Sequence, residues 1–236
     1  SYDFDVNYEY FYNSKTRDQH KIFLAGIMAK KYKGFYVGSG LEFDYFKLSS
    51  EISTRPKYII SASPFVKKSS PQWSFKTGLQ ILLDKDTSSS AKLHIYPDAM
   101  FGFNVVQSYI KFYAALNGKL EVNEPKKVIE ENPFLIRDGT LFALPNTNHA
   151  MIISAGLLGN NGIGGNYVIS ASYSFINDML FYSNLFLPED LISPQYGNSF
   201  IPLTDDLELF RIHGEIDGTI TDKISYKANA NWYSYT

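Results

Sequence analysis

The sequence contains no cysteine, which excludes disulfide bonds, zinc ribbons and thiolate chemistry. It also has no stretch near 18 consecutive apolar residues, so no transmembrane helix is expected. The formal net charge is -2, and charged residues make up only 19% of the chain. Because a basic stripe is missing as well, we expect no nucleic-acid partner.

A secretory signal peptide is also missing, because the chain starts at Ser1 and continues directly into an alternating segment. We therefore expect the 236 residues to be a mature or excised piece, folded as a single β-barrel domain without a plug. Aromatic residues are abundant, with 18 Tyr and 18 Phe. Such rings favour β-strands and membrane interfaces.

The clearest pattern lies in the segment Ala91–Leu120, where apolar and polar residues alternate with a period of two. Leu93 and Phe101 belong to the apolar row, and Lys92 and Asn104 belong to the polar row. Since strands point successive side chains to opposite faces, this pattern predicts two long strands joined by a minimal turn. Each exceeds the usual five or six residues and is long enough to cross a bilayer.

The same alternation recurs along the whole chain and predicts about eleven long strands without a convincing helix. The fold class expected is therefore all-β, an antiparallel up-and-down meander that forms a transmembrane β-barrel or a large part of one. The predicted strands are Tyr2–Tyr12, Gln19–Lys31, Phe35–Leu48, Lys57–Lys67, Gln72–Asp84, two within Ala91–Leu120, Asn148–Leu158, one that begins at Asn166, Ser199–Asp217 and Lys223–Tyr235.

Three local expectations accompany these strands. Pro64 cannot donate a ladder hydrogen bond, so a bulge is expected there. The strand from Asn166 is expected to bend at Asn177 and Asp178 if it continues toward Phe186. The strand Gln19–Lys31 is blurred, because Ile22, Leu24 and Met28 fall in the expected polar row.

The connections are expected to alternate between longer and shorter, as in barrels whose two ends face different compartments. The longest connection, Glu121–Thr147, is the best candidate for the ligand side, where it would fold inward or over the mouth. Eleven is an odd number, whereas bacterial single-chain barrels have even strand counts. The chain is therefore expected to be part of a larger barrel, roughly half of one with about 22 strands.

Several stretches resemble the barrel region of TonB-dependent receptors and related outer-membrane proteins of Gram-negative bacteria. They cover about the last two thirds of the chain and include His94–Val106, Ser108–Leu120, Glu131–Ile136, Asn146–Asn160, Tyr167–Tyr182 and Asp205–Tyr235. The chain departs from the family because nothing resembles the N-terminal plug and because it ends at Thr236 without a terminal aromatic residue. The resemblance implies the outer membrane as location and uptake or binding of an external nutrient as function. It also implies outer-membrane lipid, a small-molecule or oligomeric nutrient, a surface lipoprotein and a periplasmic energy-coupling protein as partners.

Mixed charges on the polar rows require water, because buried unpaired charges are costly. These rows are expected to line a water-filled interior and to contact a solute. The candidate ligand-binding residues are Tyr36, Glu42, Asp44, Lys76, Lys92, His94, Tyr96, Lys111, Tyr113, Arg211, His213 and Glu215. The opposite row should form an apolar belt toward lipid, with Phe75, Leu79, Ile81, Phe101, Phe103, Phe112 and Trp232.

Other sites are disfavoured. His94 and Asp98 lie about 13 Å apart along a strand, too far for a shared ion or hydrogen bond. The four histidines show no metal-ligand spacing, so we expect no enzyme, metal or cofactor. The glycine-rich segment Gly159–Gly165 is interpreted as a hairpin turn rather than a phosphate loop. Four acids, interpreted as solvated loop residues rather than calcium ligands, are Asp84, Asp86, Asp205 and Asp206.

Two alternatives stay open on the sequence alone. A soluble or cell-surface β-sheet domain for adhesion or glycan binding would pack its apolar rows between two sheets about 10 Å apart. An outer-membrane hydrolase would need a serine or a pair of acids brought within about 3 Å of a histidine by the fold.

Overall fold

The computed structural model describes residues 2–13, 17–48, 57–85, 90–106, 109–135, 144–160, 165–184, 200–221 and 223–236. These residues form eleven strands and one short helix. The elements are β1 (Tyr2–Asn13), β2 (Arg17–Tyr32), β3 (Phe35–Leu48), β4 (Lys57–Ser69), β5 (Trp73–Lys85), β6 (Lys92–Val106), β7 (Ile110–Glu121), α1 (Pro125–Glu131), β8 (Thr147–Asn160), β9 (Asn166–Asn184), β10 (Phe200–Thr221) and β11 (Ile224–Tyr235).

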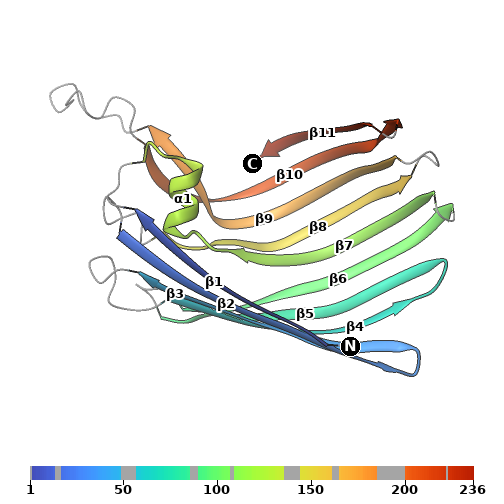
Figure 1. The fold of residues 1–236 in the computed structure, drawn as a ribbon, viewed down its shortest axis with the longest axis horizontal. Helices are drawn as coiled ribbons and strands as arrows, with labels where there is room; N and C mark the ends of the chain where they lie inside the picture. Colours follow the sequence, from blue (N-terminus) through green and yellow to red (C-terminus); the bar gives the residue numbers. More distant parts are fainter. Residues whose placement is uncertain are drawn as a thin grey trace.

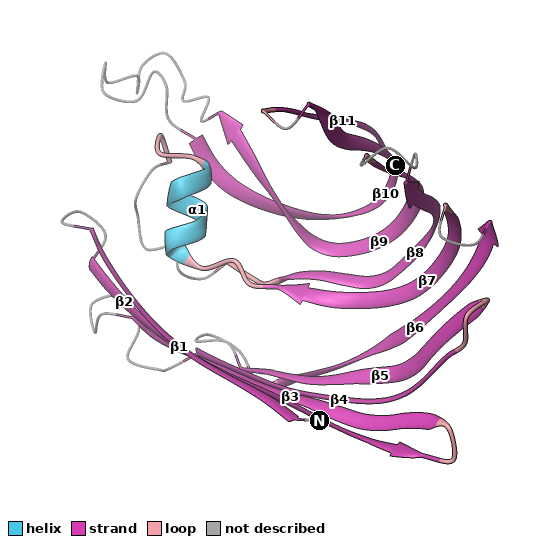
Figure 2. Ribbon diagram, turned by 45° about the vertical axis from the view of Figure 1, so that its right-hand side comes forward, coloured by secondary structure: helices cyan, strands magenta, loops and turns pink. Residues whose placement is uncertain are grey.

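The eleven strands form one antiparallel sheet whose spatial order is the sequence order (Figure 1). This confirms the predicted up-and-down meander. The described residues form no second sheet, which contradicts the sandwich alternative. β1 and β11 are the two edges of the sheet, so the sheet is curved but not closed (Figure 2).

The connections are sorted between the two ends of the sheet (Figure 1). One end, which we call the short-connection end, carries residues 33–34, 70–72, 107–109, 161–165 and 222–223. The other, the long-connection end, carries residues 14–16, 49–56, 86–91, 122–146 and 185–199. The predicted alternation of loop lengths is confirmed, with both of the longest connections at the same end.

The hairpin between β2 and β3 shows how a short connection is made. Lys33 has φ 46° and Gly34 has φ 83°. Two successive positive φ angles fit a two-residue turn of the primed type, whose twist matches that of the flanking strands. Glycine adopts this conformation without strain, which explains its place at the second position.

Helix α1 lies on the concave side of the sheet (Figure 2). It contacts Glu9 of β1, Lys21 of β2 and Glu121 of β7. We call the face that carries these side chains the inner face and the opposite one the outer face. Because directly paired residues share a face, the register extends this assignment across the whole sheet. One such inner row runs through Ala25, Glu42, Ser61, Leu82 and His94.

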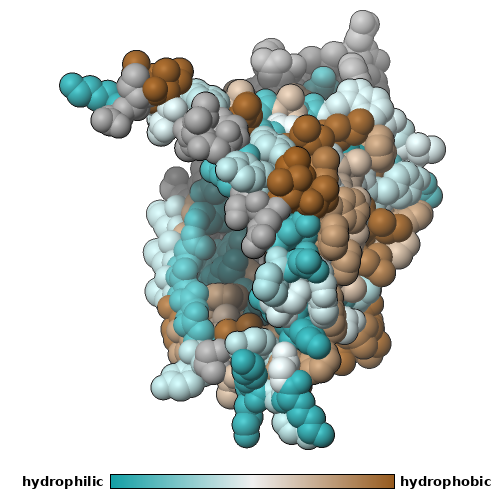
Figure 3. All heavy atoms as spheres, turned by 90° about the vertical axis from the view of Figure 1, so that its right-hand side faces the viewer, coloured by the Kyte–Doolittle hydropathy of each residue, from teal (hydrophilic) through white to brown (hydrophobic). Residues whose placement is uncertain are grey.

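All seven belt residues lie on the outer face by this register. No second layer among the described residues covers them, and Leu79, Phe101 and Trp232 are 48%, 45% and 55% exposed. Viewed from the short-connection end, hydrophobic residues follow the outer side and hydrophilic residues border the hollow (Figure 3). The outer face is therefore an apolar surface that no other described element covers, as lipid contact requires.

The register corrects two local expectations. Val6 pairs with Leu24 and Tyr8 pairs with Ile22, so the apolar residues of β2 share the outer face with the aromatic row of β1. The expectation that they occupy the polar row was wrong, because the face of each β2 residue follows from its pairing with β1. At Pro64 the pairing with β5 is interrupted, but the register does not shift, so the expected bulge is absent.

The predicted bend of β9 is confirmed. Asp178 has φ 55°, and the pairing with β10 shifts between Asp205 and Leu207, but β9 continues to Asn184. The helix α1 was not predicted. Pro125 occupies its first turn, where a missing N–H costs no hydrogen bond, but seven residues are too few for a clear helical period.

The two buried clusters found among the described residues both lie at the long-connection end. Phe46, Ile59, Leu82 and Tyr96 form a buried cluster on the inner face of β3 to β6. Val128 and Leu135 form a second cluster with α1. The inner face is therefore not wet along its whole length, because residues 122–135 and 144–146 cover part of it at the long-connection end.

Candidate solute-binding site

The inner face carries a hollow of about 780 Å³, which we call the inner pocket. It is wide enough for a small organic solute. Its charged lining residues come from β1, β3, β5, β6 and β7 and comprise Asp3, Asp5, Glu42, Lys76, Asp98 and Lys119. Two of the predicted ligand-binding residues, Glu42 and Lys76, lie here.

The charges in the inner pocket are only partly paired. Lys76 Nζ lies 2.5 Å from Asp98 Oδ2, and Lys119 Nζ lies 3.6 Å from Glu121 Oε2. Glu42 accepts a hydrogen bond of 3.3 Å from the Ser61 hydroxyl. Both lysines thus have carboxylate partners, and acids outnumber bases among the charged residues that line the cavity. The pocket presents polar and charged groups to an open space.

All twelve predicted ligand-binding residues lie on the inner face, but the structure distributes them over separate places. Tyr36 lies toward the short-connection end, where the Lys31 ammonium is 6.0 Å from its ring centroid. Lys111 and Tyr113 lie on β7 at the same level as Leu158 and Gly156 of β8. Ligand binding by these residues stays a prediction.

A second polar cluster joins β10 and β11. Arg211 donates from Nε and Nη2 to Asn231 Oδ1 at 3.0 and 2.7 Å, and His213 Nδ1 lies 2.9 Å from the same oxygen. Lys227 Nζ lies 2.9 Å from Glu215 Oε1. The sequence predicted Arg211, His213 and Glu215, and the structure brings them together with two residues of the neighbouring strand that the prediction missed.

Tyr96 is placed on the inner face as expected, but it is only 2% exposed. Its hydroxyl donates to Asn148 Oδ1 at 2.8 Å, and its ring belongs to the buried cluster with Phe46. Tyr96 is therefore part of the buried wall, and ligand binding by it stays a prediction. Leu120 of β7 and Val122 just after it pack on the same cluster.

Three further predicted residues lie on the inner face toward the long-connection end: Asp44, Lys92 and His94. Asp44 lines a cavity of about 100 Å³, and Lys92 and His94 line another of about 110 Å³ together with Asp84. Each of these spaces has room for about three water molecules. They are too small for a nutrient, so the inner pocket is the better site.

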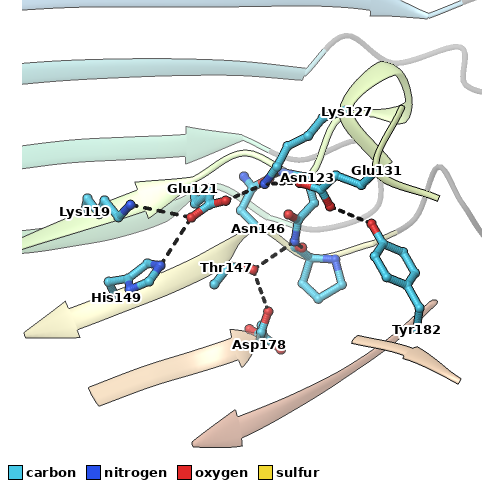
Figure 4. Close-up of polar contacts among 11 residues, drawn as sticks. Lys119, Glu121, Asn123, Lys127, Glu131, Asn146, Thr147, His149, Asp178 and Tyr182 are labelled. Carbon is cyan, nitrogen blue, oxygen red and sulfur yellow. Dashed lines mark hydrogen bonds and ion pairs between the residues drawn. The ribbon is translucent and has the colours of Figure 1, made fainter. Parts of the chain in front are cut away.

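Two networks hold the connection 122–146 in place, and sequence reasoning missed both (Figure 4). Around Glu121, Lys127 forms an ion pair, and His149 Nε2 lies 3.3 Å from Oε2. Around Asn123, the side-chain amide donates to Pro145 O at 2.8 Å and to Thr147 Oγ1 at 3.0 Å. Asn123 is buried, and these hydrogen bonds join the start of the connection to its end. Only the many charged residues in Glu121–Glu131 pointed to such a network.

Glu131 and Tyr182 tie α1 to β9, because the Tyr182 hydroxyl donates to Glu131 Oε2 at 2.7 Å (Figure 4). On the other side of the helix, Lys126 forms an ion pair with Glu9. The hydrogen bond that the Lys126 ammonium donates to Glu9 within this ion pair raises the pKa of Lys126 above its ordinary value, so the ammonium stays charged. The predicted inward folding of the longest connection is confirmed for its helical part.

The acids considered for calcium are not gathered in one loop. Asp84 is buried at the end of β5, where it accepts a hydrogen bond of 3.0 Å from Asn146, so it is not a solvated loop acid. Asp205 and Asp206 belong to β10. Asp86 lies outside the described residues, as do residues 161–164 of the glycine-rich segment. Within the described part of the chain, no three His, Cys, Asp or Glu side chains are grouped to hold a metal ion.

The fold resembles that of a known transporter. The solved structure named copper transporter OprC aligns with 92% of this chain at a TM-score of 0.53 and a sequence identity of 11%. The chain spans only 38% of that protein's length. No protein-family model and no curated protein sequence matches the chain. Among the described helical residues, none forms a helix long and apolar enough to cross a membrane.

At this identity the likeness shows the fold alone. The chain forms an antiparallel meander that makes up a large part of a transmembrane β-barrel. Copper transport is a property of that neighbour, as its name says, and is not carried over to this chain.

Proposed function

We propose that this chain is the solute-lining part of an outer-membrane β-barrel, related in kind to TonB-dependent receptors, that takes up or binds an external nutrient. The observation that carries the proposal is the division of one sheet into two unlike faces. The outer face is apolar and no other described element covers it, and the inner face bears the charged inner pocket. A membrane barrel with a wet interior needs this division.

The role proposed is non-enzymatic transport or binding. Uptake is favoured over anchoring because α1, from the longest connection, lies over the inner face (Figure 2), where it would meet a solute arriving from the long-connection end. A surface lipoprotein and a periplasmic energy-coupling protein are proposed partners on the basis of the family resemblance alone. The proposed location is the outer membrane of a Gram-negative bacterium.

Cysteine labelling tests the two faces directly, because the chain has no native cysteine. Ala171 lies on the outer face and Ser172 on the inner face, next to each other in β9. In cells that produce the full-length protein, a membrane-impermeant maleimide is expected to label the Ser172→Cys variant and to spare the Ala171→Cys variant. Equal labelling of both would contradict a lipid-facing outer row.

The uptake itself is tested by comparing cells with and without the full-length gene in a mixed-nutrient medium. Mass spectrometry of the medium then follows the depletion of each solute over time. The cells that lack the gene are expected to deplete one class of solute more slowly. Identical depletion of every solute would leave the faces intact but refute the uptake role.

A further inference from the structure

The two sides of α1 are attached to the sheet by different forces. Toward β9 and β10 the attachment is mainly apolar, with a hydrogen bond from Tyr182 to Glu131, and Val128 is fully buried with 0% exposure. The packed residues on this side are Val128, Leu135, Leu144, Leu180, Tyr182 and Phe200. Such burial is not screened by salt and is lost only when the packing opens.

The backbone strengthens the same side. The Phe200 amide donates to the Phe134 carbonyl at 3.2 Å, and Leu135 forms a parallel bridge with Phe200. The segment that follows α1 is therefore joined to the start of β10 as a short piece of sheet. This side of the helix is its fixed attachment.

Toward β1 and β2, the contacts of α1 and of Glu124, the residue just before it, are hydrogen bonds and ion pairs. Lys126 pairs with Glu9, and Glu124 accepts hydrogen bonds from Gln19 Nε2 at 2.5 Å and from Lys21 Nζ at 3.3 Å. The side chains of Lys126 and Glu9 are 27% and 39% exposed. Ion pairs open to water in this way are weak and are screened by salt. This side of the helix is therefore the easier one to release.

The strand that is held weakly also lines the inner pocket. β1 contributes Asp3 and Asp5 to the pocket, and Glu9, farther along the same strand toward the long-connection end, holds α1. A separation of α1 from β1 and β2 opens the inner face between the long-connection end and the inner pocket. The polar contacts thus lie on the route that a solute takes.

We propose that the seam between α1 and the β1–β2 hairpin is a gate, closed by the Glu9–Lys126 and Lys21–Glu124 contacts and hinged on the apolar attachment to β9 and β10. The gate limits which solutes reach the inner pocket from the long-connection end. This inference rests on the proposed function, because it assumes that the inner face is a solute path. It adds the part of the molecule that controls access.

The first test removes the closing contacts. The Glu9→Gln/Lys21→Met double variant of the full-length protein is produced in cells with a periplasmic β-lactamase, and hydrolysis of added nitrocefin reports permeability of the outer membrane. If the open form is the minor one, each ion pair removed raises the rate by about 1.5- to 5-fold. The matched control is Glu130→Gln, on the exposed side of the same helix, and it is expected to leave the rate unchanged.

The second test locks the seam in a folded molecule. Glu9→Cys and Lys126→Cys are combined in the cysteine-free chain and joined by a bis-methanethiosulfonate linker, which dithiothreitol cleaves. The linked protein is expected to admit nitrocefin no faster than cells without the gene, and cleavage is expected to restore passage in the same molecules. A misfolded variant cannot imitate this reversal.

The possible results separate the gate from the proposed function. Raised permeability in the double variant together with reversible block by the linker supports the gate. Unchanged permeability in both tests, with the protein in the outer membrane and Ser172→Cys labelled, overturns the gate and leaves the function standing. A protein that is absent from the outer-membrane fraction overturns the function and the gate together.

Discussion

Ile153 and Ser154 are the two central residues of β8, and they face opposite sides of the sheet. Ile153 lies on the outer face between Leu116 of β7 and Tyr173 of β9 and is 48% exposed. Ser154 lies on the inner face between two small residues, Ala115 and Ser172. An arginine introduced at either position has room, so the two variants differ in the medium that the new charge meets.

In a bilayer, arginine on the lipid face near the midplane costs about 2 to 4 kcal/mol, whereas a wet interior accepts it at little cost. Ile153→Arg is therefore expected to lower the folding equilibrium constant by about thirty- to several hundredfold, since 1.4 kcal/mol corresponds to a factor of ten. Ser154→Arg is expected to change the free energy of folding by less than about 1 kcal/mol. In water, both substitutions on a half-exposed strand would cost similar small amounts.

The assay is urea unfolding of the full-length protein from lipid vesicles, followed by tryptophan fluorescence and by the heat-dependent mobility of folded barrels in gels. The difference between the two midpoints, converted with a common slope, gives the cost of the lipid-facing charge. Equal destabilisation by both variants, or a larger effect of Ser154→Arg, would refute the assignment of the outer face to lipid.

Three further predictions concern the wall and the pocket. Tyr96→Phe removes a buried hydroxyl and leaves Asn148 Oδ1 without its donor, so unfolding free energy should fall by about 1 to 3 kcal/mol while solute binding is unchanged; a binding defect at full stability would contradict its structural role. Gly78→Ala should cost about 1 to 3 kcal/mol, because its Cβ would lie 2.3 Å from the Pro64 carbonyl oxygen, whereas Gly214→Ala, with open space around it, should be neutral in the same thermal melts. Asp98→Asn breaks the partly exposed ion pair with Lys76, so the free energy of unfolding should fall by up to about 1 kcal/mol in low salt and by less in 1 M salt. If the loss measured by urea unfolding is the same at both salt concentrations, this ion pair is not its cause.

Alternation alone was sufficient to predict the meander, because a period of two held over long segments has few other physical causes. It also placed residues such as Glu42 and Phe101 on the correct faces. The assignment of residues to the two faces was wrong in β2, where the face of Ile22 and Leu24 follows only from their pairing with the aromatic row of β1. Register of this kind depends on the neighbouring strand, which a single segment does not contain.

The site was less predictable than the fold. The burial of Tyr96 depends on a connection that returns to the inner face, and the contacts of Glu121 with His149 and of Lys126 with Glu9 join residues far apart in the sequence. Long-range side-chain contacts leave no periodic trace. Helix α1 escaped detection because its attachment, rather than its own composition, stabilises so short a segment.

The odd number of strands restricts what can complete the wall. Neighbouring strands alternate in direction, so β1 and β11 both ascend toward the long-connection end. Another molecule of this chain, inserted the same way up, would set ascending strands against ascending strands at both margins and break the antiparallel ladder. The margins instead call for descending strands on both sides, since bare backbone groups are not tolerated in hydrocarbon. Strands that continue the antiparallel ladder at both margins of the described sheet would therefore have to be odd in number.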